Sequence, residues 1–567
     1  MSADGGWPHQ LTISDQRQSE PAWSPDGKWI AYISDYDGDE QWDIFLVSPI
    51  TGQVINLTGT RDVAEIDPAW SPDGKVLAYA SKPRNSSSYE IHLVSLDHGM
   101  ALELTANTDK QLSNVHPLWS RDGKSVAFTR VRADEKDSDV FVARLADEAG
   151  PRKLTAHEGE KTFSAEAWSP DDKSLLVTSN AKNGYENVAA IDVQSGKLDW
   201  ITSDKWETSA AGYSPDGKTI VVHSNVDGSG EIQFVSRDRK ARALPLPSGM
   251  NQSLAWPAAF SPDGKRLAYY HDGSDSPRDV WMLDVKTGKS HRVTDSLVGG
   301  LRSDDLTPAQ LVHFPSRDRK WTLSAFVFIP PNWKPDGRHP GVVYVHGGPE
   351  AQFQNEFNAT VQLLVSEGYA VIAPNYRGST GYGKAYQDAN RFDMGGADLQ
   401  DVLAAADFLR ATGFVDGKQL AIMGRSYGGY MTMMGLTKAP REFAAGVAIV
   451  PFVNWFTEVK NEDPQLREYD LSTMGDPIKD KALWEDRSPL YHVKDIVSPF
   501  LMIAGGHDPR CPKEEAQQVF DAVKQRGGDV ELRIYENEGH QFGRVENQVG
   551  HLKLAIEFLK KHVPPVR

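Results

Sequence analysis

Cysteine is almost absent from this chain of 567 residues, because Cys511 is the only one. A single cysteine excludes an intramolecular disulfide framework and a cysteine-rich metal site, and it suits a reducing compartment. The sequence also lacks any apolar run near the roughly 20 residues that a membrane span needs. No basic stretch followed by an apolar one stands at its start, so we expect no signal peptide. We therefore expect a cytoplasmic protein with no membrane association.

Positive charge is scarce as well. Lys and Arg total 61 against 78 Asp and Glu, which gives a formal net charge of −17. A surface this acidic repels nucleic acid and anionic lipid, and we expect neither as a partner. No group of His, Asp or Glu has convincing metal-ligand spacing, and no glycine run has the pattern of a phosphate loop. The sequence therefore predicts no metal and no cofactor.

One phrase, an aromatic residue followed by Ser-Pro-Asp-Gly-Lys, recurs through the first 300 residues. Its six copies, two of them altered, begin at Trp23, Trp70, Trp119, Trp168, Tyr213 and Phe260, and their serines are 47, 49, 49, 45 and 47 residues apart. Pro-Asp-Gly favours a turn, and short β-rich runs such as residues 29–33 and 43–47 follow the turns. Several short strands in each unit are typical of a propeller blade. The repeated aromatic and Asp residues therefore indicate blade packing and turns rather than catalysis.

We predict an all-β propeller with six visible blades over residues 1–300; a seventh blade would require a degenerate copy of the phrase. The pattern then changes. From residue 301 to 567, β-rich runs alternate with helical stretches, which predicts βαβ units and a parallel sheet. Expected strands include residues 323–329, 341–345 and 419–423, and helices include 397–410 and 548–561. We expect an α/β-hydrolase fold there, with a short N-terminal segment of the chain packing on it.

Residues 424–429, Gly-Arg-Ser-Tyr-Gly-Gly, contain the Gly-x-Ser-x-Gly pattern between a β-rich run and a helical run. A sharp strand-to-helix turn requires small residues two positions before and after the serine, since larger side chains would collide. Such a turn presents the serine hydroxyl to a base, which a hydroxyl needs in order to act as a nucleophile. We predict Ser426 as the nucleophile.

An acid and a histidine should follow the nucleophile in that order. Asp508 and His540 do so, each just after an expected strand, where α/β sheets place their sites. His540 would accept the Ser426 proton, and Asp508 would orient the imidazole. Two other histidines compete for the role of base. His507 adjoins the proposed acid, so its side chain should point elsewhere, and His346 precedes the serine, which is the wrong order.

His346 opens the sequence His-Gly-Gly-Pro after the expected strand at 341–345. Glycines there let a backbone N–H approach a substrate oxygen closely. We predict the amides of Tyr427 and Gly348 as the oxyanion donors. Asp398 and Asp401 lie three apart on the expected helix at 397–410; they could imitate an acid pair, but we interpret them as solvated residues of the helix face.

These motifs together resemble the prolyl oligopeptidase family of serine peptidases, and most closely its acylaminoacyl peptidase (acylpeptide hydrolase) branch. The resemblance covers nearly the whole chain and is most specific at five segments: residues 346–349, 375–383, 426–429, 508–512 and 538–540. It implies a propeller that caps the active site, so that substrates are short peptides or small esters rather than folded proteins. Family members often assemble, and an exposed edge strand could mediate a homo-oligomer.

The resemblance also implies substrate-binding residues. An arginine two positions after the catalytic aspartate binds a substrate backbone carbonyl in family members, and Arg510 matches that position. Phe452 and Trp455, with Phe456, are candidates for the apolar specificity pocket, although they could equally be ordinary core. Dipeptidyl peptidases of the family bind a free amino terminus with acidic residues, but no such pair is identifiable from the sequence.

Three functions follow from this sequence. The first is a serine peptidase that cleaves short peptides, including N-acylated ones, through an acyl-enzyme. The second is a carboxylesterase that acts on small esters with the same triad, since esters carry better leaving groups than amides. The third is a propeller binding module that carries an inactive hydrolase domain; intact Ser426, Asp508 and His540 argue against it.

Overall fold

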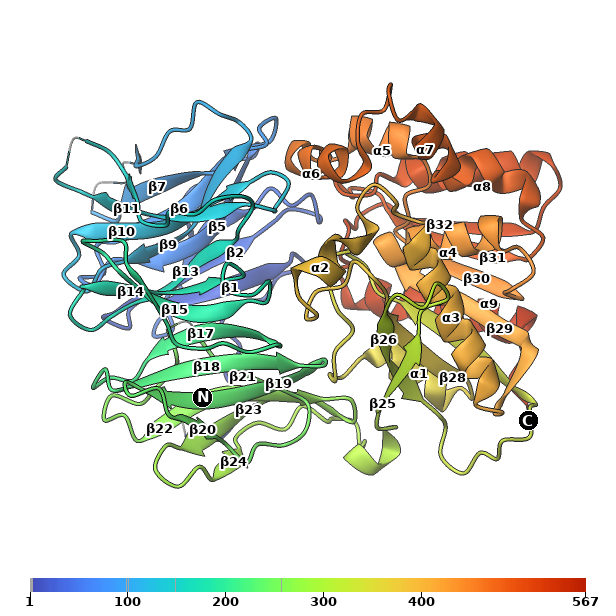
Figure 1. Cartoon of the computed structure of the whole chain (residues 1–567), viewed down its shortest axis with the longest axis horizontal. Helices are drawn as coiled ribbons and strands as arrows, with labels where there is room; N and C mark the ends of the chain where they lie inside the picture. Colours follow the sequence, from blue (N-terminus) through green and yellow to red (C-terminus); the bar gives the residue numbers. More distant parts are fainter. Residues whose placement is uncertain (1–3, 98, 100, 148, 256, 567) are drawn as a thin grey trace.

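The computed structural model describes residues 4–97, 99, 101–147, 149–255 and 257–566. It consists of two domains, a propeller built from the first half of the chain and an α/β domain built from the second (Figure 1). The two face each other across one broad interface. Within the described residues, no helix is both long and apolar enough to cross a membrane.

The propeller has six four-stranded antiparallel sheets, each built from consecutive strands. This confirms the predicted six blades, and the described residues form no seventh. The strands of blades 1 to 3 are β1 (Gln18–Trp23), β2 (Ile30–Ser34), β3 (Asp43–Val47), β4 (Val54–Asn56), β5 (Val63–Trp70), β6 (Val76–Pro83), β7 (Glu90–Ser95), β8 (Ala101–Glu103), β9 (Leu112–Trp119), β10 (Ser125–Arg132), β11 (Ser138–Arg144) and β12 (Arg152–Lys153). Those of blades 4 to 6 are β13 (Phe163–Trp168), β14 (Ser174–Ser179), β15 (Asn187–Asp192), β16 (Leu198–Trp200), β17 (Glu207–Tyr213), β18 (Thr219–Val226), β19 (Ser229–Ser236), β20 (Ala241–Ala243), β21 (Met250–Ser253), β22 (Arg266–Gly273), β23 (Ser276–Asp284) and β24 (Ser290–Arg292).

The repeated phrase forms the turn between the first and second strands of every blade. In blade 2 the Ser71 hydroxyl donates to Asp73 at 2.7 Å, and Asp73 accepts the amide of Lys75 at 3.1 Å. The same Ser–Asp bond closes the other five turns at 2.7 to 2.8 Å. Short side chains that bond to nearby backbone favour turns over strands, so the phrase ends one strand and starts the next.

The aromatic residues of the phrase join neighbouring blades, as the sequence predicted. The indole N–H groups of Trp70, Trp119 and Trp168 each donate to a backbone carbonyl of the preceding blade at 2.9 to 3.1 Å. Trp23 of blade 1 is 59% exposed instead. Apolar clusters link blade 1 successively to blade 6, but among the described residues none links blade 6 back to blade 1. The ring is therefore least tightly packed between its first and last blades.

The second domain contains one sheet of eight strands in the order β25-β26-β28-β27-β29-β30-β31-β32. The strands are β25 (Gln310–Pro315), β26 (Thr322–Phe328), β27 (His339–Val345), β28 (Ala370–Asn375), β29 (Val415–Arg425), β30 (Ala445–Ile449), β31 (Phe500–Gly505) and β32 (Val530–Tyr535). The first two are antiparallel to their neighbours and the remaining pairs are parallel. The strands from β27 to β31 are mostly buried, apart from residues 416–419 at the start of β29, as expected of a sheet covered on both faces.

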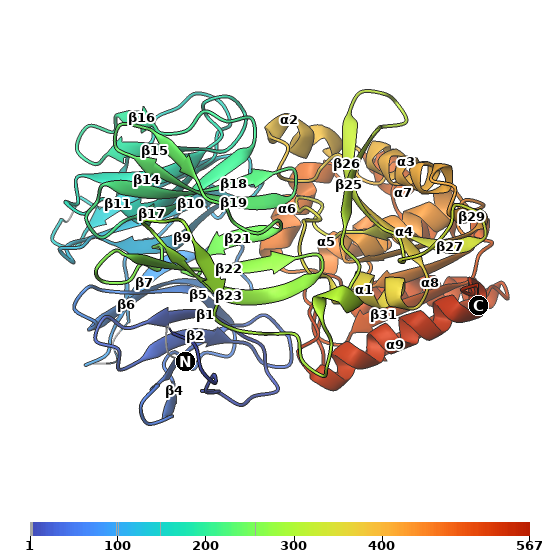
Figure 2. The same cartoon turned by 90° about the horizontal axis from the view of Figure 1, so that it is seen from below.

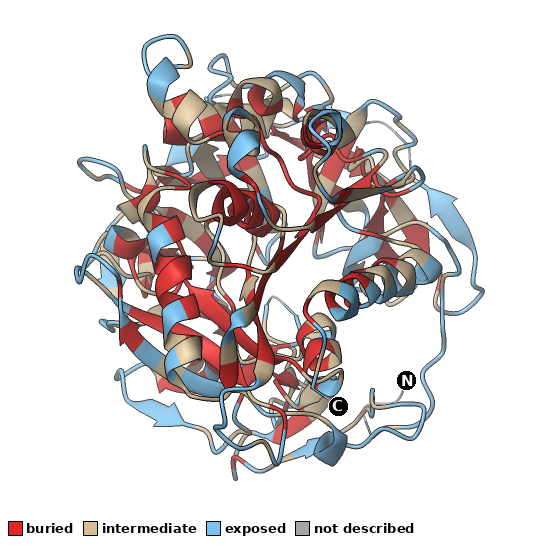
Figure 3. Cartoon of the chain, turned by 90° about the vertical axis from the view of Figure 1, so that its right-hand side faces the viewer, coloured by how far each residue is buried: buried red, intermediate tan, exposed pale blue. Residues whose placement is uncertain are grey.

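Helices cover both faces of this sheet and turn their buried sides toward it (Figure 3). They are α1 (Ala359–Ser366), α2 (Lys384–Gln387), α3 (Ala397–Ala411), α4 (Tyr427–Lys438), α5 (Trp455–Asn461), α6 (Pro464–Met474), α7 (Lys481–Asp486), α8 (Lys513–Gln525) and α9 (Val545–His562), with short 3-10 turns at Ser303–Asp305, Asp388–Asn390 and Pro489–Asp495. This arrangement confirms the predicted α/β-hydrolase fold. Each strand and helix that the sequence predicted there is present, whereas β25, β30 and helices α5 to α8 were not predicted.

The interface is formed by the turns between the second and third strands of the blades, on the propeller rim opposite the repeated phrase (Figure 2). All six of these turns or their flanking strand ends bond to the second domain. The contacting residues are Glu40, Lys82, Asp134, Gly184, Gly228 and Ser274. One rim of the propeller therefore covers the α/β domain, and the other faces away from it.

Candidate active site

Ser426 occupies a strained turn between β29 and α4. Its backbone has φ 58° and ψ −124°, which few non-glycine residues adopt. Its amide donates to the carbonyl of Ile449 at 2.9 Å, which fixes the turn against the neighbouring strand. A side chain on Gly428 would overlap the carbonyl of Val345, and one on Gly424 would overlap Gly428. The small residues of the Gly-x-Ser-x-Gly pattern are therefore required here by close backbone contact.

Asp508 and His540 come together at the same edge of the sheet. The carboxylate oxygens of Asp508 lie 2.8 and 3.0 Å from Nδ1 of His540. Both residues are buried, and Asp508 also accepts the amides of Arg510 and Cys511 at 2.9 and 3.0 Å. These two backbone bonds hold the Asp508 carboxylate in place beside the imidazole.

Arg425 connects the nucleophile turn to the histidine loop. Its guanidinium donates to the backbone carbonyl of His540, and it directly precedes Ser426. The competing His507 is exposed and lies 3.3 Å from the carbonyl of Asp37 in the propeller, so it points away from this centre. Since Nδ1 of His540 faces Asp508, the predicted proton transfer from Ser426 would use Nε2.

Glu538 shapes the histidine loop, a function that the sequence analysis missed. Its buried carboxylate accepts the amides of Gly543 and Arg544 at 2.6 and 3.1 Å and the side-chain amide of Asn547 at 2.7 Å. A carboxylate that accepts three N–H groups closes the loop around His540. A glutamate two residues before the predicted base, His540, was the available signal.

The loop at residues 346–349 lies against the nucleophile turn. A Cβ on Gly347 would be 3.0 Å from the Arg425 carbonyl and 3.3 Å from Cβ of Ser426. His346 stacks on Tyr376 with ring centroids 4.3 Å apart and bonds to the Ser379 hydroxyl at 2.9 Å. Burial lowers the pKa of His346 to about 4, so its ring is neutral and holds the loop rather than acting as a base.

Two aspartates of α3 are buried and bond to residues near the nucleophile turn. This corrects our interpretation of them as solvated residues of the helix face. Asp398 and Asp401 are both 0% exposed rather than solvated. Asp398 accepts the hydroxyl of Tyr427 at 2.5 Å, and burial raises its pKa to about 7. Asp401 binds the guanidinium of Arg377 at 2.7 and 2.8 Å. Helix periodicity alone could not show this, because both faces of α3 are covered near its start.

Phe452 and Trp455 form an aromatic cluster beside the nucleophile helix. Phe452 stacks on Tyr430 at a centroid distance of 4.5 Å, and its ring lies 4.7 Å from that of Trp455. The indole N–H of Trp455 lies 3.3 Å from the Tyr430 hydroxyl. Phe452 is 6% exposed and Trp455 is 1% exposed. The cluster packs in the core, and its function in substrate binding stays a prediction.

An acidic pocket of about 200 Å³ opens between the two domains. The carboxylates of Glu135, Glu186 and Glu207 line it from the propeller, and Glu350 lines it from the second domain, two residues after Gly348. Arg391 binds Glu350 at 2.6 Å. Burial and the neighbouring carboxylates raise the pKa of Glu186 to about 8, and burial raises that of Glu207. Lys384 and Asp388 also line the pocket, so its acidic residues outnumber its basic ones.

A second group of acids lies buried behind Asp508. Glu458 is 1% exposed and Glu462 is 6% exposed, near Asp470 and the thiol of Cys511. Burial and neighbouring carboxylates raise the pKa of both glutamates far above their usual range, and burial raises the pKa of Asp470 to about 7. Burial therefore favours the neutral form of these acids.

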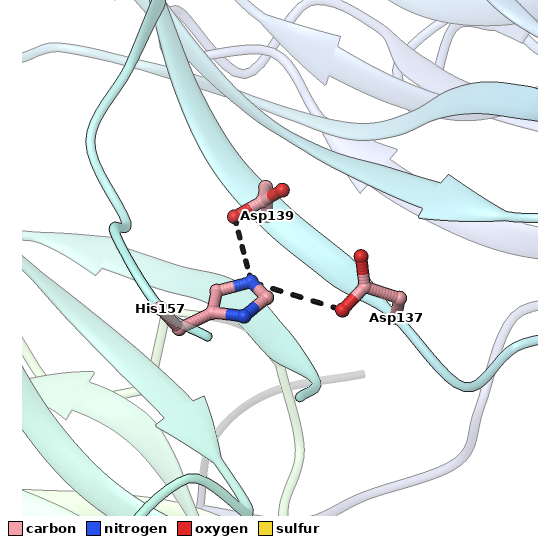
Figure 4. A group of neighbouring side chains, drawn as sticks. All are labelled: Asp137, Asp139 and His157. Carbon is pink, nitrogen blue, oxygen red and sulfur yellow. Dashed lines mark hydrogen bonds and ion pairs between the residues drawn. The ribbon is translucent and has the colours of Figure 1, made fainter. Parts of the chain in front are cut away.

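One group of side chains in the propeller has the spacing of metal ligands. The side chains are Asp137, Asp139 and His157, with ligand atoms within 4.8 Å of one another (Figure 4). Asp139 already binds His157 at 3.1 Å, Lys153 at 2.5 Å and Thr155 at 2.6 Å. A bond from a threonine to an acidic side chain recurs at the same place in other blades, for example Glu90–Thr105 at 2.7 Å and Asp279–Thr294 at 2.6 Å. The group therefore belongs to the architecture of the blade.

Two family models match separate parts of the chain. Residues 355–565 match the prolyl oligopeptidase family, and residues 108–300 match the TolB β-propeller domain. Dipeptidyl aminopeptidase BIII of Pseudoxanthomonas mexicana is 30% identical over 411 residues, 69% of this chain and 58% of that protein. The acylamino-acid-releasing enzyme of Rattus norvegicus is 27% identical over 405 residues, 70% of this chain and 50% of that protein. The chain thus spans less than two thirds of the length of these relatives.

Solved structures share the same two-domain fold. A puromycin-hydrolyzing peptidase of Mycobacterium tuberculosis superposes with a TM-score of 0.85 at 21% identity, over 97% of this chain and 87% of that one. The acylaminoacyl peptidase of Pyrococcus horikoshii superposes with a TM-score of 0.74 at 20% identity, over 98% and 90%. At these identities the likeness concerns the fold. The match over residues 355–565 shows that the second domain of this chain belongs to the prolyl oligopeptidase family.

Proposed function

We propose that this protein is a serine peptidase that cleaves short peptides through an acyl-enzyme formed on Ser426. The contact between His540 and Asp508 at 2.8 Å, at the sheet edge that presents Ser426, carries this proposal. The dipeptidyl and acylamino-acid peptidases among the relatives support the same class of reaction.

In this mechanism Ser426, His540 and Asp508 each have a separate role. The Ser426 oxygen attacks the carbonyl carbon while Nε2 of His540 takes its proton, and His540 then gives that proton to the leaving amine as the C–N bond breaks. Asp508 holds the imidazole and stabilises its protonated form. The amides of Tyr427 and Gly348 bind the oxygen that becomes negative. Water then attacks the acyl-enzyme with His540 as the base, which breaks the bond to Ser426 and frees the carboxylate product.

The propeller restricts the substrate by size. All six of its interface turns contact the second domain, on the rim that covers the sheet edge with the site. A folded protein could not reach a serine under this cover, whereas a short peptide could. A cytoplasmic location and a homo-oligomeric state stay predictions from the sequence.

The acidic pocket favours peptides with a free amino terminus over N-acylated ones. Its four glutamates lie at the domain interface and continue into the second domain at Glu350, next to the oxyanion loop. A protonated amine would offset the repulsion among these carboxylates, whereas an uncharged acyl group would not. Arg510 would bind a backbone carbonyl, and Phe452 and Trp455 would shape the apolar pocket.

The substitution Ser426→Ala tests the nucleophile. We expect it to lower kcat for peptide amides by at least about 10⁴-fold, because it removes the attacking atom. Thermal unfolding should be unchanged, and a fluorophosphonate probe should label the wild type at Ser426 but not the variant. A wild-type protein that the probe does not label would favour the inactive binding module.

A matched substrate set tests the remaining choices. Free and N-acetylated forms of one peptide p-nitroanilide, and the corresponding p-nitrophenyl ester, are compared by kcat/KM. We expect the free form to react at least tenfold faster than the acetylated form. A preference for the acetylated peptide would contradict the function of the acidic pocket, and hydrolysis of the ester alone would indicate a carboxylesterase.

A further inference from the structure

The turn between β2 and β3 of blade 1 has an unusual position in this protein. Its residues 36–40 are the only interface turn that, among the described residues, bonds to both the aspartate loop and the histidine loop of the candidate active site. We call it the blade-1 turn. The remaining interface turns bond elsewhere on the second domain, for example to Lys384 and Asn355.

The blade-1 turn is held firmly within its own domain. The amide of Asp37 donates to the side chain of Gln16, Asp39 binds Arg84 at 2.8 Å, and Glu40 lies 3.5 Å from Arg17. Its backbone adopts positive φ at Asp37, Gly38 and Glu40, with values of 51°, 79° and 55°. Contacts from three separate partners fix this conformation, so the turn is a rigid surface against which a loop can be placed.

On the histidine loop, the turn meets the residue before His540. A Cβ on Gly38 would overlap the backbone nitrogen of Gly539, and a Cβ on Gly539 would overlap the carbonyl oxygen of Gly38. Only two glycines allow the chains to approach this closely. Asp37 also binds Arg544 at 3.2 Å at the other end of the loop. The propeller therefore contacts the histidine loop on both sides of the imidazole.

On the aspartate loop, the turn binds the residue that we expect to hold the substrate. Both carboxylate oxygens of Glu40 accept from Nε of Arg510, at 2.9 and 3.1 Å. Arg510 is otherwise an exposed side chain, and its amide donates to Asp508. Glu40 thus orients the guanidinium of Arg510, and the backbone amide of Arg510 donates to the Asp508 carboxylate.

We propose that the blade-1 turn positions the active site. Gly38 fixes the position of His540 through its contact with Gly539, and Glu40 orients Arg510 toward the substrate. Gly38 and Glu40 are positioning residues, since they act through other groups. This inference rests on the proposed function of Ser426, His540 and Asp508. It makes the propeller part of the catalytic geometry as well as a cover that selects substrates by size.

The substitution Gly38→Ala, compared with Gly52→Ala, tests the first half. Gly52 lies in another turn of blade 1 with φ 72°, and a Cβ there meets nothing within 4 Å, so both variants share the backbone strain but only one displaces Gly539. We expect Gly38→Ala to lower kcat about 10²-fold with KM within about threefold, because a displacement near 1 Å has that effect on an aligned site. Gly52→Ala should retain wild-type kcat and KM.

Hydrogen–deuterium exchange supplies a readout independent of turnover. The peptide covering residues 536–544 should exchange faster in Gly38→Ala than in the wild type, and at the wild-type rate in Gly52→Ala. Equal kcat values in the two glycine variants, with unchanged exchange at 536–544, would overturn the inference. If wild-type turnover did not require Ser426, the proposed function itself would fail, so the two failures are distinguishable.

The substitution Glu40→Gln tests the second half and keeps the side chain the same size. We expect KM for peptide substrates to rise about fivefold with kcat within about twofold, since the loss concerns one charge-assisted bond that orients Arg510. Exchange at residues 506–513 should increase. If Gly38→Ala fails to fold, Glu40→Gln decides alone: an unchanged KM together with unchanged exchange at 506–513 would refute the positioning function of the turn.

Discussion

The two rims of the propeller differ in a way that separates architecture from function. We call the rim that faces away from the α/β domain the outer rim. Its six turns share one sequence pattern and one Ser–Asp hydrogen bond of 2.7 to 2.8 Å. On the rim that covers the α/β domain, the inner rim, six turns of unlike sequence contact six different parts of that domain. A repeated feature serves the ring, because every blade must pack on its neighbour. The turns of the inner rim, which do not share the repeated pattern, are therefore the better candidates for a specific function.

The charges of the two rims differ as well. Asp26 and Asp263 on the outer rim accept bonds from lysine and serine neighbours, which lower the pKa of each to about 2. Glu166 and Glu186, near the interior and the inner rim, have pKa values raised by burial to about 7 and about 8. Folding therefore lowers the pKa of the outer-rim carboxylates and raises the pKa of these buried ones, so their contributions to stability change with pH in opposite directions.

The largest expected difference between the rims concerns two lysines of blade 2. The ammonium of Lys82 is buried and binds Asp463 of α6 at 2.7 Å across the interface, whereas Lys75 is exposed in the outer-rim phrase. Lys82→Met leaves a half-buried carboxylate without its partner, so we expect the free energy of unfolding to fall by about 2 kcal/mol. Lys75→Met should change it by less than about 0.5 kcal/mol. Urea unfolding of both variants checks this, and equal losses would contradict the contrast.

The next difference appears in the dependence of stability on pH. The folded state raises the pKa of Glu186 to about 8 from the usual 4.5, so the folded protein binds the proton more tightly and stability falls as pH rises between those values. Glu186→Gln cannot titrate, and we expect it to exceed the wild type by about 1 kcal/mol at pH 8.5 but not at pH 4.5. Urea unfolding at both pH values measures this.

Asp26→Asn is the outer-rim counterpart of that experiment. Because the folded state lowers the pKa of Asp26 to about 2, its contribution to stability is present above about pH 4 and is lost as pH falls toward 2. The variant should therefore be less stable than the wild type at neutral pH and approach it in acid. A loss for both variants in the same pH range would remove the contrast between the rims.

The smallest expected effect on activity is on the outer rim. Asp73→Ala removes the acceptor of two bonds in one turn, and we expect about 1 kcal/mol of lost stability. Because that turn lies on the rim away from the active site, kcat/KM should stay within twofold of the wild type. An activity loss beyond the measured loss of folded protein would show that the outer rim also affects catalysis.

Local patterns predicted most of the elements of this chain. The Ser-Pro-Asp-Gly-Lys phrase identified every blade because its turn forms from residues within five positions of one another. In the α/β domain the strands and helices with clear periodicity were found, such as β27 and α3. Strand β30 and helices α5 to α7 were not, because their residues are buried by distant partners rather than by a local amphipathic pattern. Helix α8 was also not predicted, although its buried residues do follow an amphipathic pattern.

Burial of charge was the main source of error. Asp398 and Asp401 have the spacing of an exposed helix face, yet both are fully buried by Tyr427 and Arg377 from other segments. Glu40 carried no distinctive local pattern, and its partner Arg510 lies in the other domain. Spacing along one helix cannot show which distant side chain will cover it.

The sequence by itself determined the six turns of the propeller and the nucleophile turn at Ser426, since each depends on the shapes of adjacent residues. The order of motifs also predicted the contact of Asp508 with His540. Only the tertiary structure decided that four glutamates gather at the domain interface and that Gly38 contacts Gly539. Those contacts join residues separated by tens to hundreds of positions, and their geometry follows from how two domains pack rather than from any local preference of the chain.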